Sequence, residues 1–145
     1  MSTSENLIKW EDTTPFVFPI SGGQVIKVYD GDTITIASKL PYDSSPLYRL
    51  SVRFNGIDTP EIKGKTADEK QVAREARDAL AGLIMNKQIR LENVESEKYG
   101  RILADVYLGD LHINKWLSEN RYAVAYSGGT KTRPENWVEY RNFDN

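Results

Sequence analysis

The sequence predicts a mainly β domain of the α+β class: a small closed barrel of five strands with two to three attached helices. Three observations favour this fold. Five short runs rich in β-branched and aromatic residues alternate apolar with polar side chains. One strongly amphipathic segment interrupts these runs after the third of them. With 145 residues, of which 39% are apolar and 28% charged, the chain has the length and composition of one soluble globular domain.

The first three predicted strands follow one another closely. They cover Val25 to Tyr29, Thr33 to Lys39 and Tyr48 to Phe54. An Asp-Gly pair, a favoured hairpin turn, separates the first two. The segment Leu40 to Leu47 contains two prolines, which a central strand does not tolerate, so we expect a loop there.

A helix is predicted over Ala67 to Met85. Thr66 and Glu69 have the spacing of a capping box, and apolar residues follow at helical intervals. Alternating runs at Gln88 to Val94 and Ile102 to Leu108 then predict the fourth and fifth strands.

Two shorter helices are expected towards the end of the chain. The first carries Ile113, Trp116 and Leu117. The second carries Trp137 and Tyr140, and a second capping box, Thr132 to Glu135, is expected to open it.

Three strands, a helix and two further strands within about a hundred residues favour a small closed barrel, of which the OB-fold, a five-stranded Greek-key barrel, is the commonest kind. We expect this domain to occupy residues 25–145. Residues 1–24 form an N-terminal extension rich in Ser, Thr, Pro and Gly, yet they include Trp10, Phe16 and Phe18. These apolar side chains favour an extension that packs partly on the domain.

Composition excludes several classes of protein. The chain has no cysteine, so disulfides, thiolate zinc sites and cysteine nucleophiles are excluded. Its net charge of −2 gives no general attraction to polyanions. The chain contains neither an apolar stretch of roughly 20 residues nor a secretory signal. We therefore expect a cytoplasmic monomer that does not contact membranes, or a secreted one if a leader has been removed.

Acidic residues gather where predicted strands end. Asp30 and Asp32 flank Gly31 after the first strand, and Asp58 and Glu61 follow the third. In isolation, Asp-Gly-Asp-Thr is explained by an ordinary hairpin turn, and Asp-Thr-Pro-Glu by a turn or a helix start. Together, the carboxylates repel one another unless a hard cation lies between them, and oxygen-only ligands favour Ca²⁺ or Mg²⁺.

Two arginines favour a functional site over ordinary turns. Arg53 precedes Asp58 by five residues, and Arg101 ends a Lys-Tyr-Gly-Arg sequence that begins at Lys98. A guanidinium presents paired planar donors to phosphate oxygens and stays charged at any working pH. Two arginines close to an acidic cluster therefore indicate a site for a phosphate group.

The ordered set Asp-Gly-Asp-Thr, Arg, Asp-Thr-Pro-Glu and Lys-Tyr-Gly-Arg resembles the thermonuclease family typified by staphylococcal nuclease, over roughly Val25 to Tyr126. The resemblance implies an OB-fold barrel. It also implies a Ca²⁺-dependent endonuclease that cleaves both DNA and RNA and prefers single strands. Such an enzyme has little sequence specificity and leaves 3′-phosphate products.

Transferred residue by residue, the resemblance assigns a role to each motif. The side chains of Asp32 and Asp58 and the backbone carbonyl of Thr59 would bind Ca²⁺. Glu61 would act on the attacking water. The catalytic residues Arg53 and Arg101 would contact the phosphate. Lys98, Tyr99 and Tyr126 would contact the nucleic acid.

This chain departs from the family pattern in three places. The loop Leu40 to Leu47 is longer, and the segment Ile62 to Lys65 is shorter. Arg121 occupies a position where the family often has glycine, so we expect a left-handed backbone there. The alternatives to an active nuclease are a binding module that has lost catalysis and an OB-fold that binds oligosaccharides or a protein. Neither alternative needs the complete set of acids and arginines.

Overall fold

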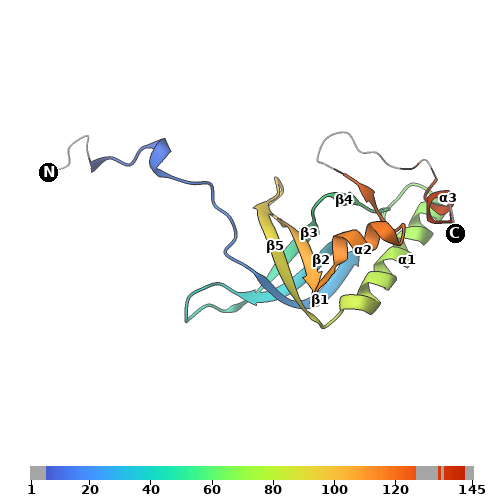
Figure 1. The fold of residues 1–145 in the computed structure, drawn as a ribbon, viewed down its shortest axis with the longest axis horizontal. Coiled ribbons are helices and arrows are strands. Elements are labelled where there is room, and N and C mark those ends of the chain that lie inside the picture. The colour runs from blue at the N-terminus through green and yellow to red at the C-terminus, as the bar shows by residue number, and fades with distance from the viewer. Residues whose placement is uncertain (1–5, 127–133, 135, 143–145) are drawn as a thin grey trace.

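The computed structural model describes residues 6–126, 134 and 136–142. It contains a closed five-stranded barrel, which confirms the predicted OB-fold (Figure 1). The barrel strands are β1 (Gly22–Asp30), β2 (Thr33–Lys39), β3 (Leu47–Phe54), β5 (Gln88–Ser96) and β6 (Ile102–Leu108). Neighbouring strands pair antiparallel in the order β3-β2-β1-β5-β6, and a parallel pairing of β3 with β6 closes the barrel.

The barrel closes around side chains that the alternating pattern directs inward. Fully buried examples are Val25, Ile34, Ile36, Val52, Phe54, Ile102 and Val106. Three two-residue strands extend this framework. They are β4 (Ile57–Asp58) and β8 (Val124–Ala125), which pair with each other, and β7 (Leu111–His112), which pairs with β6.

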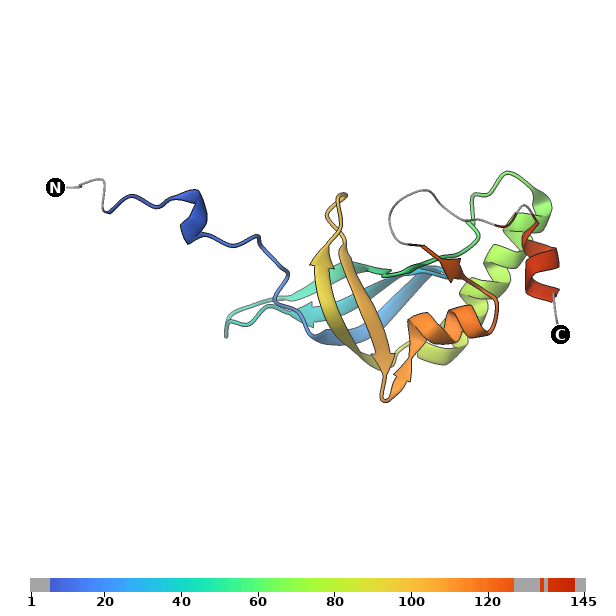
Figure 2. The same ribbon diagram turned by 45° about the horizontal axis from the view of Figure 1, so that its top comes forward.

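Three helices lie beside the barrel, on the side opposite the N-terminal segment (Figure 2). They are α1 (Ala67–Ile84), α2 (Ile113–Glu119) and α3 (Trp137–Asn142). Helix α1 buries Val72, Ala73, Ala76, Leu80 and Ile84, which are spaced by one, three or four residues, as an amphipathic helix requires. The predicted capping box Thr132 to Glu135 lies outside the described residues.

The first predicted capping box is formed only in half. As expected, the Thr66 hydroxyl accepts a hydrogen bond from the Glu69 backbone N–H at 3.0 Å. The Glu69 carboxylate instead accepts from the Glu61 backbone N–H at 3.3 Å, in place of the N-cap N–H that a capping box supplies. The sequence pattern therefore identified the start of α1 correctly but gave Glu69 the wrong partner.

Arg121 has the left-handed backbone expected at this position, with φ of 60°. Its side chain provides contacts that glycine would lack. Arg121 Nε donates to the Tyr140 carbonyl at 2.6 Å, and the guanidinium lies over the Tyr140 ring at 4.2 Å. These contacts connect the turn after α2 to α3 and offset the strain of a left-handed arginine.

The N-terminal segment runs away from the barrel in both views (Figures 1 and 2). A short 3₁₀ turn, η2 (Trp10–Asp12), interrupts it, and the side chain of Trp10 is 89% exposed. Contact with the barrel core begins at Phe18 and Ile20. The division into residues 1–24 and 25–145 stays a prediction. Among the described residues, no helix combines the length and apolarity that a membrane span requires.

A buried amide in α2 holds the loop between β3 and β4. Asn114 Oδ1 accepts from the Val106 N–H at 2.9 Å, and Asn114 Nδ2 donates to the Asn55 carbonyl at 2.8 Å. Asn114 is only 3% exposed, so its loss leaves backbone groups without partners. Because Asn55 lies between Arg53 and Asp58 in the sequence, this bond also restrains the segment that connects two candidate site residues.

Asn114→Ala is therefore expected to lower the free energy of unfolding by roughly 2–4 kcal/mol, measured by urea denaturation. The matched control is Asn120→Ala, which removes an exposed amide that donates to the Trp116 carbonyl from the C-cap position of the same helix. This control should change the free energy of unfolding by less than about 1 kcal/mol. Equal effects of the two substitutions would show that the buried bonds contribute nothing specific.

Candidate active site

Strand register explains why the predicted site residues meet at one end of the barrel. Arg53 on β3 pairs with Thr33 of β2 on one side and with Leu103 of β6 on the other. Asp32 immediately precedes Thr33, and Arg101 precedes Leu103 by two residues. Both therefore lie beside Arg53, although they are far apart in the sequence.

Two aspartates converge on the Arg53 guanidinium. Arg53 Nη2 lies 3.5 Å from Asp32 Oδ2 and 3.7 Å from Asp58 Oδ1. Both aspartates are buried, at 6% and 3% exposure. Arg53 Nη1 donates to the Phe54 carbonyl at 2.6 Å, which fixes the plane of the guanidinium. One carboxylate from the β1–β2 turn and one from β4 thus share a single guanidinium of the protein itself.

Thr59 is fixed by the same carboxylate. Its backbone N–H donates to Asp32 Oδ2 at 3.2 Å, and its side chain is buried at 1% exposure. Gly31 makes this approach possible, since a Cβ there would lie 3.1 Å from Thr59 Cγ2 and 3.1 Å from the Ala76 Cβ on α1. Glycine is required here by space and not by a left-handed backbone. The β1–β2 turn, the loop after β4 and α1 therefore pack together around Gly31.

The acidic cluster carries more negative than positive charge. Asp30, Asp32 and Asp58 surround Arg53, so two charges are uncompensated when all three acids are ionised. Burial, together with the neighbouring Asp32 charge, raises the pKa of Asp30 to about 8. The cluster thus has the electrostatic character of a site that accommodates a cation.

The predicted acids and arginines line one cavity of about 280 Å³. Its walls include Asp30, Asp32, Arg53, Asp58, Glu61 and Arg101. Glu61 is exposed in the loop before α1. The structure therefore brings the predicted acids to the same cavity as both predicted arginines. Within the described part of the chain, no three His, Cys, Asp or Glu side chains assemble as a metal-binding group. The expected third donor, the Thr59 carbonyl, belongs to the backbone.

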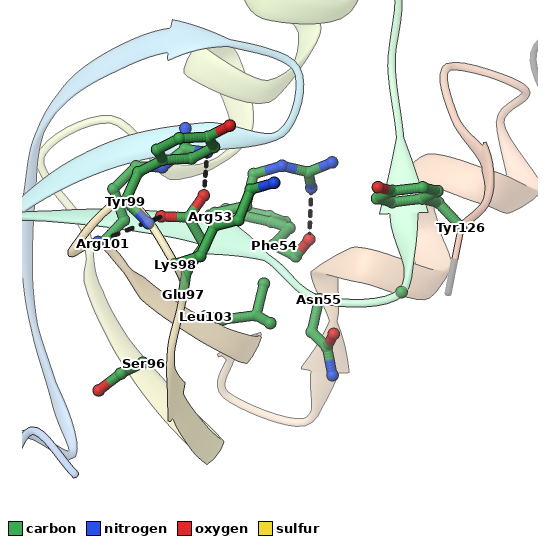
Figure 3. A pocket seen from close by; sticks show the side chains of 11 residues that line it. Arg53, Phe54, Asn55, Ser96, Glu97, Lys98, Tyr99, Arg101, Leu103 and Tyr126 are labelled. Carbon is green, nitrogen blue, oxygen red and sulfur yellow. Dashed lines mark hydrogen bonds and ion pairs between the residues drawn. The ribbon is translucent and has the colours of Figure 1, made fainter. Parts of the chain in front are cut away.

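A second cavity, of about 540 Å³, shares Arg53 and Arg101 with the first. Lys98 and Tyr99 enter it from the turn between β5 and β6, and Tyr126 enters it from the end of β8 (Figure 3). The Lys98 Nζ lies 5.0 Å from the centre of the Tyr99 ring, which is 74% exposed. A cation, an exposed aromatic ring and the half-buried ring of Tyr126 beside two shared arginines form a surface suited to a nucleotide.

Arg101 is held by an acid that the sequence analysis did not identify. Glu97 Oε2 accepts from Arg101 Nη2, and Glu97 Oε1 accepts from the Tyr99 N–H at 3.0 Å and the Arg101 N–H at 3.3 Å. The Glu97 hydrogen bond raises the pKa of Arg101 further, and the Arg101 guanidinium lowers the pKa of Glu97 below 4.5. The sequence signal that could have identified Glu97 is a carboxylate four residues before an arginine, within a predicted hairpin turn.

The Glu97–Arg101 pair predicts a pH-dependent contribution to stability. Because the pKa of Glu97 is lowered by folding, its contribution is present above pH 4.5 and is lost as the pH falls through the lowered pKa. The unfolding free energy of the wild type should therefore exceed that of Glu97→Gln at pH 7, and the two should converge as the pH falls through the lowered pKa. Urea denaturation across this range measures the difference. Glu95→Gln, which neutralises an exposed carboxylate at the end of β5, controls for net charge, and a difference independent of pH would contradict the assignment.

The single histidine lies outside both cavities. His112 stacks on the Tyr107 ring, with 4.7 Å between ring centres, at the β6–β7 hairpin. It lines neither cavity. The candidate chemistry therefore rests on carboxylates and arginines.

The fold and the site together define an OB-fold domain with an acidic and arginine-lined cavity at one end of the barrel. The chain belongs to the staphylococcal nuclease homologue family, whose model matches residues 51–144. It is 34% identical over 104 residues to the thermonuclease of Staphylococcus hyicus, covering 70% of this chain and 57% of that protein. It is 31% identical over 105 residues to an uncharacterized endonuclease of Escherichia coli, covering 72% of this chain and 60% of that protein. The chain thus spans less than two thirds of the length of either relative.

Proposed function

We propose that this protein is a calcium-dependent endonuclease that hydrolyses phosphodiester bonds of DNA and RNA with little sequence specificity and leaves 3′-phosphate ends. The observation that carries the proposal is one cavity lined by buried aspartates, an exposed glutamate and two arginines. Family membership and relatives named thermonuclease and endonuclease support the same reaction class.

The donor set fits a hard divalent cation. Asp32 and Asp58 offer carboxylate oxygens that converge on the Arg53 guanidinium, and carboxylate oxygens are the ligands that Ca²⁺ prefers. We assign the Asp32 and Asp58 side chains and the Thr59 carbonyl as its ligands. When bound, Ca²⁺ would neutralise a phosphate oxygen and thereby favour attack on phosphorus.

The side chains of this protein supply the other requirements of hydrolysis. Glu61, exposed at the cavity, takes a proton from the attacking water. Arg53 and Arg101 donate hydrogen bonds to the phosphate oxygens, whose negative charge grows in the transition state. Attack opposite the 5′ oxygen forms a bond from the water oxygen to phosphorus and breaks the bond to the 5′ oxygen. The released 5′ oxygen takes up a proton from solvent and becomes a hydroxyl, and the phosphate stays on the 3′ side.

The neighbouring cavity binds the nucleotide that flanks the cleaved phosphate. Lys98 and Tyr99, with Tyr126 entering from β8, offer a cation and ring faces, which accept a base of any sequence (Figure 3). An unpaired base reaches such rings without the cost of unstacking a duplex. We therefore propose that single strands are preferred and that a monomer, away from any membrane, carries out the reaction.

Cleavage of 5′-labelled oligonucleotides tests the proposal. Single-stranded DNA, duplex DNA and RNA should all be cut at many positions in Ca²⁺, single strands fastest, and the labelled products should carry 3′-phosphates. Products that carry 3′-hydroxyls would contradict the proposed direction of attack. Binding of oligonucleotides without any cleavage would instead support a binding module.

A further inference from the structure

The loop that carries Glu61 connects β4 to α1 (Figure 2). The same loop is attached to the first turn of α1. Both backbone groups of Glu61 are engaged in this attachment. The Glu61 carbonyl accepts from the Gly64 N–H at 2.9 Å, which closes a turn. The Glu61 N–H donates to the Glu69 carboxylate at 3.3 Å. Two hydrogen bonds thus restrain the backbone from which the Glu61 side chain extends.

Glu69 is suited to this restraint because its own backbone is rigid. Its N–H donates to the Thr66 hydroxyl at 3.0 Å. The helix α1 also buries five side chains in the turns that follow Glu69. In a complete capping box the carboxylate would turn back to the N-cap residue. Here it reaches out of the helix to Glu61, eight residues earlier in the chain.

Gly64 leaves room for the Glu69 side chain. Gly64 is buried, and a Cβ at this position would lie 2.6 Å from Glu69 Cδ and 2.9 Å from Glu69 Oε2. These distances are too short for any carbon contact, so an alanine at position 64 forces the carboxylate to move. The end of a glutamate side chain moves easily, and the rest of the fold is not strained by the change.

We propose that Glu69 is a positioning residue for Glu61: it binds the Glu61 backbone N–H and thereby holds the Glu61 carboxylate at the cavity that contains Asp32, Arg53 and Asp58. This inference rests on the proposed function, because it assigns Glu69 a role through the group that takes the proton from water. Small displacements of such a group reduce the rate strongly while substrate contacts stay intact.

Kinetics of four variants test the role. Glu69→Ala should lower kcat by roughly 10- to 100-fold with KM within about twofold, because the arginines that contact the phosphate are unchanged. Gly64→Ala should have a similar effect. Glu69→Gln keeps an acceptor oxygen at the same reach and should restore most of the rate. Asp68→Ala removes an acid from the same helical turn and should leave kcat unchanged. A kcat unchanged in Glu69→Ala, or lowered equally in Asp68→Ala, would overturn the role.

A double-mutant cycle separates positioning from a general structural contribution. In a Glu61→Ala background, Glu69→Ala should lower the residual rate by less than about twofold, since a positioning residue acts only through the group it holds. Multiplicative losses would instead show that Glu69 acts independently of Glu61 and would overturn the inference.

Hydrogen exchange of the Glu61 amide gives a readout besides activity. Protection of this amide should fall in Glu69→Ala and Gly64→Ala and persist in Glu69→Gln and Asp68→Ala. Unchanged protection in the first two variants overturns the inference, whatever their activity. A wild type that cleaves no nucleic acid contradicts the proposed function and the positioning role together. Wild-type cleavage with an unchanged rate in Glu69→Ala contradicts the positioning role alone.

Discussion

Arg101→Ala is expected to lower kcat for oligonucleotide cleavage by about 10³-fold or more, while the thermal unfolding midpoint changes little. Arg101 lines both cavities, and in the proposed mechanism its guanidinium stabilises the charge that develops on the phosphate oxygens, so a large effect on the rate is expected. The small effect on stability follows from the partial exposure of its ion pair with Glu97, in which the Arg101 side chain is 34% exposed.

Arg90→Ala is the matched control for Arg101→Ala. Arg90 also forms an ion pair with a nearby glutamate, Glu92, and its guanidinium lies over the Tyr107 ring away from both cavities. Its removal should leave kcat unchanged. An Arg101→Ala variant that keeps more than about a tenth of the wild-type rate would remove Arg101 from the mechanism.

Arg53 is a less informative target. Its guanidinium is within 4 Å of Asp32 and Asp58, both of which are buried. Arg53→Ala would leave these carboxylates without their common counter-charge, so a loss of rate would be mixed with a loss of stability. Rate measurements on this variant need the unfolding midpoint beside them.

Asp58→Asn is expected to raise the Ca²⁺ concentration for half-maximal activity at least tenfold and to lower kcat/KM by about 10²-fold or more. The substitution keeps the shape of a side chain that is 3% exposed, but it removes the charge that a hard cation prefers. A substitution at Asp32 would also disturb the hydrogen bonds that its carboxylate accepts from the Thr59 N–H and the Thr33 hydroxyl.

Calcium titrations of the cleavage rate measure this shift. The control is Asp43→Asn, which neutralises an exposed acid in the loop between β2 and β3 and should leave the midpoint unchanged. An unaltered midpoint in Asp58→Asn would refute the assignment of Asp58 as a ligand.

Local patterns in the sequence were sufficient for most elements of the fold. The run from Thr33 to Lys39 alternates clearly and is bounded by turn residues, and β2 has these same bounds. The cap at Thr66 and the apolar spacing after it located α1 to within one residue, since it ends at Ile84 and not at Met85. The strands β4, β7 and β8 were not predicted, because two residues are too few to show an alternating pattern.

The parallel pairing that closes the barrel was beyond reach of local patterns. Register between β3 and β6 depends on how the buried side chains of both strands pack together. That register brings Arg53 beside Arg101. The order of the motifs in the sequence could suggest a shared site, but it could not show that Arg53 contacts both aspartates.

The roles of Glu97 and Glu69 also depend on the folded chain. Glu97 lies within one hairpin turn with Arg101, yet many acids in turns are only solvated. Glu69 matched a capping box, and the same pattern is compatible with either of two backbone N–H partners. Only the close approach of the loop 61–64 to α1 determines which partner is used.

We propose that the carboxylate and arginine cavity hydrolyses phosphodiesters when Ca²⁺ is bound at Asp32 and Asp58. The most direct test is the rate of cleavage of one single-stranded oligonucleotide as a function of free Ca²⁺, from excess chelator to millimolar concentration. We expect no cleavage in chelator and a saturable rise in the cleavage rate with Ca²⁺. A rate in chelator equal to the rate in millimolar Ca²⁺ would contradict it.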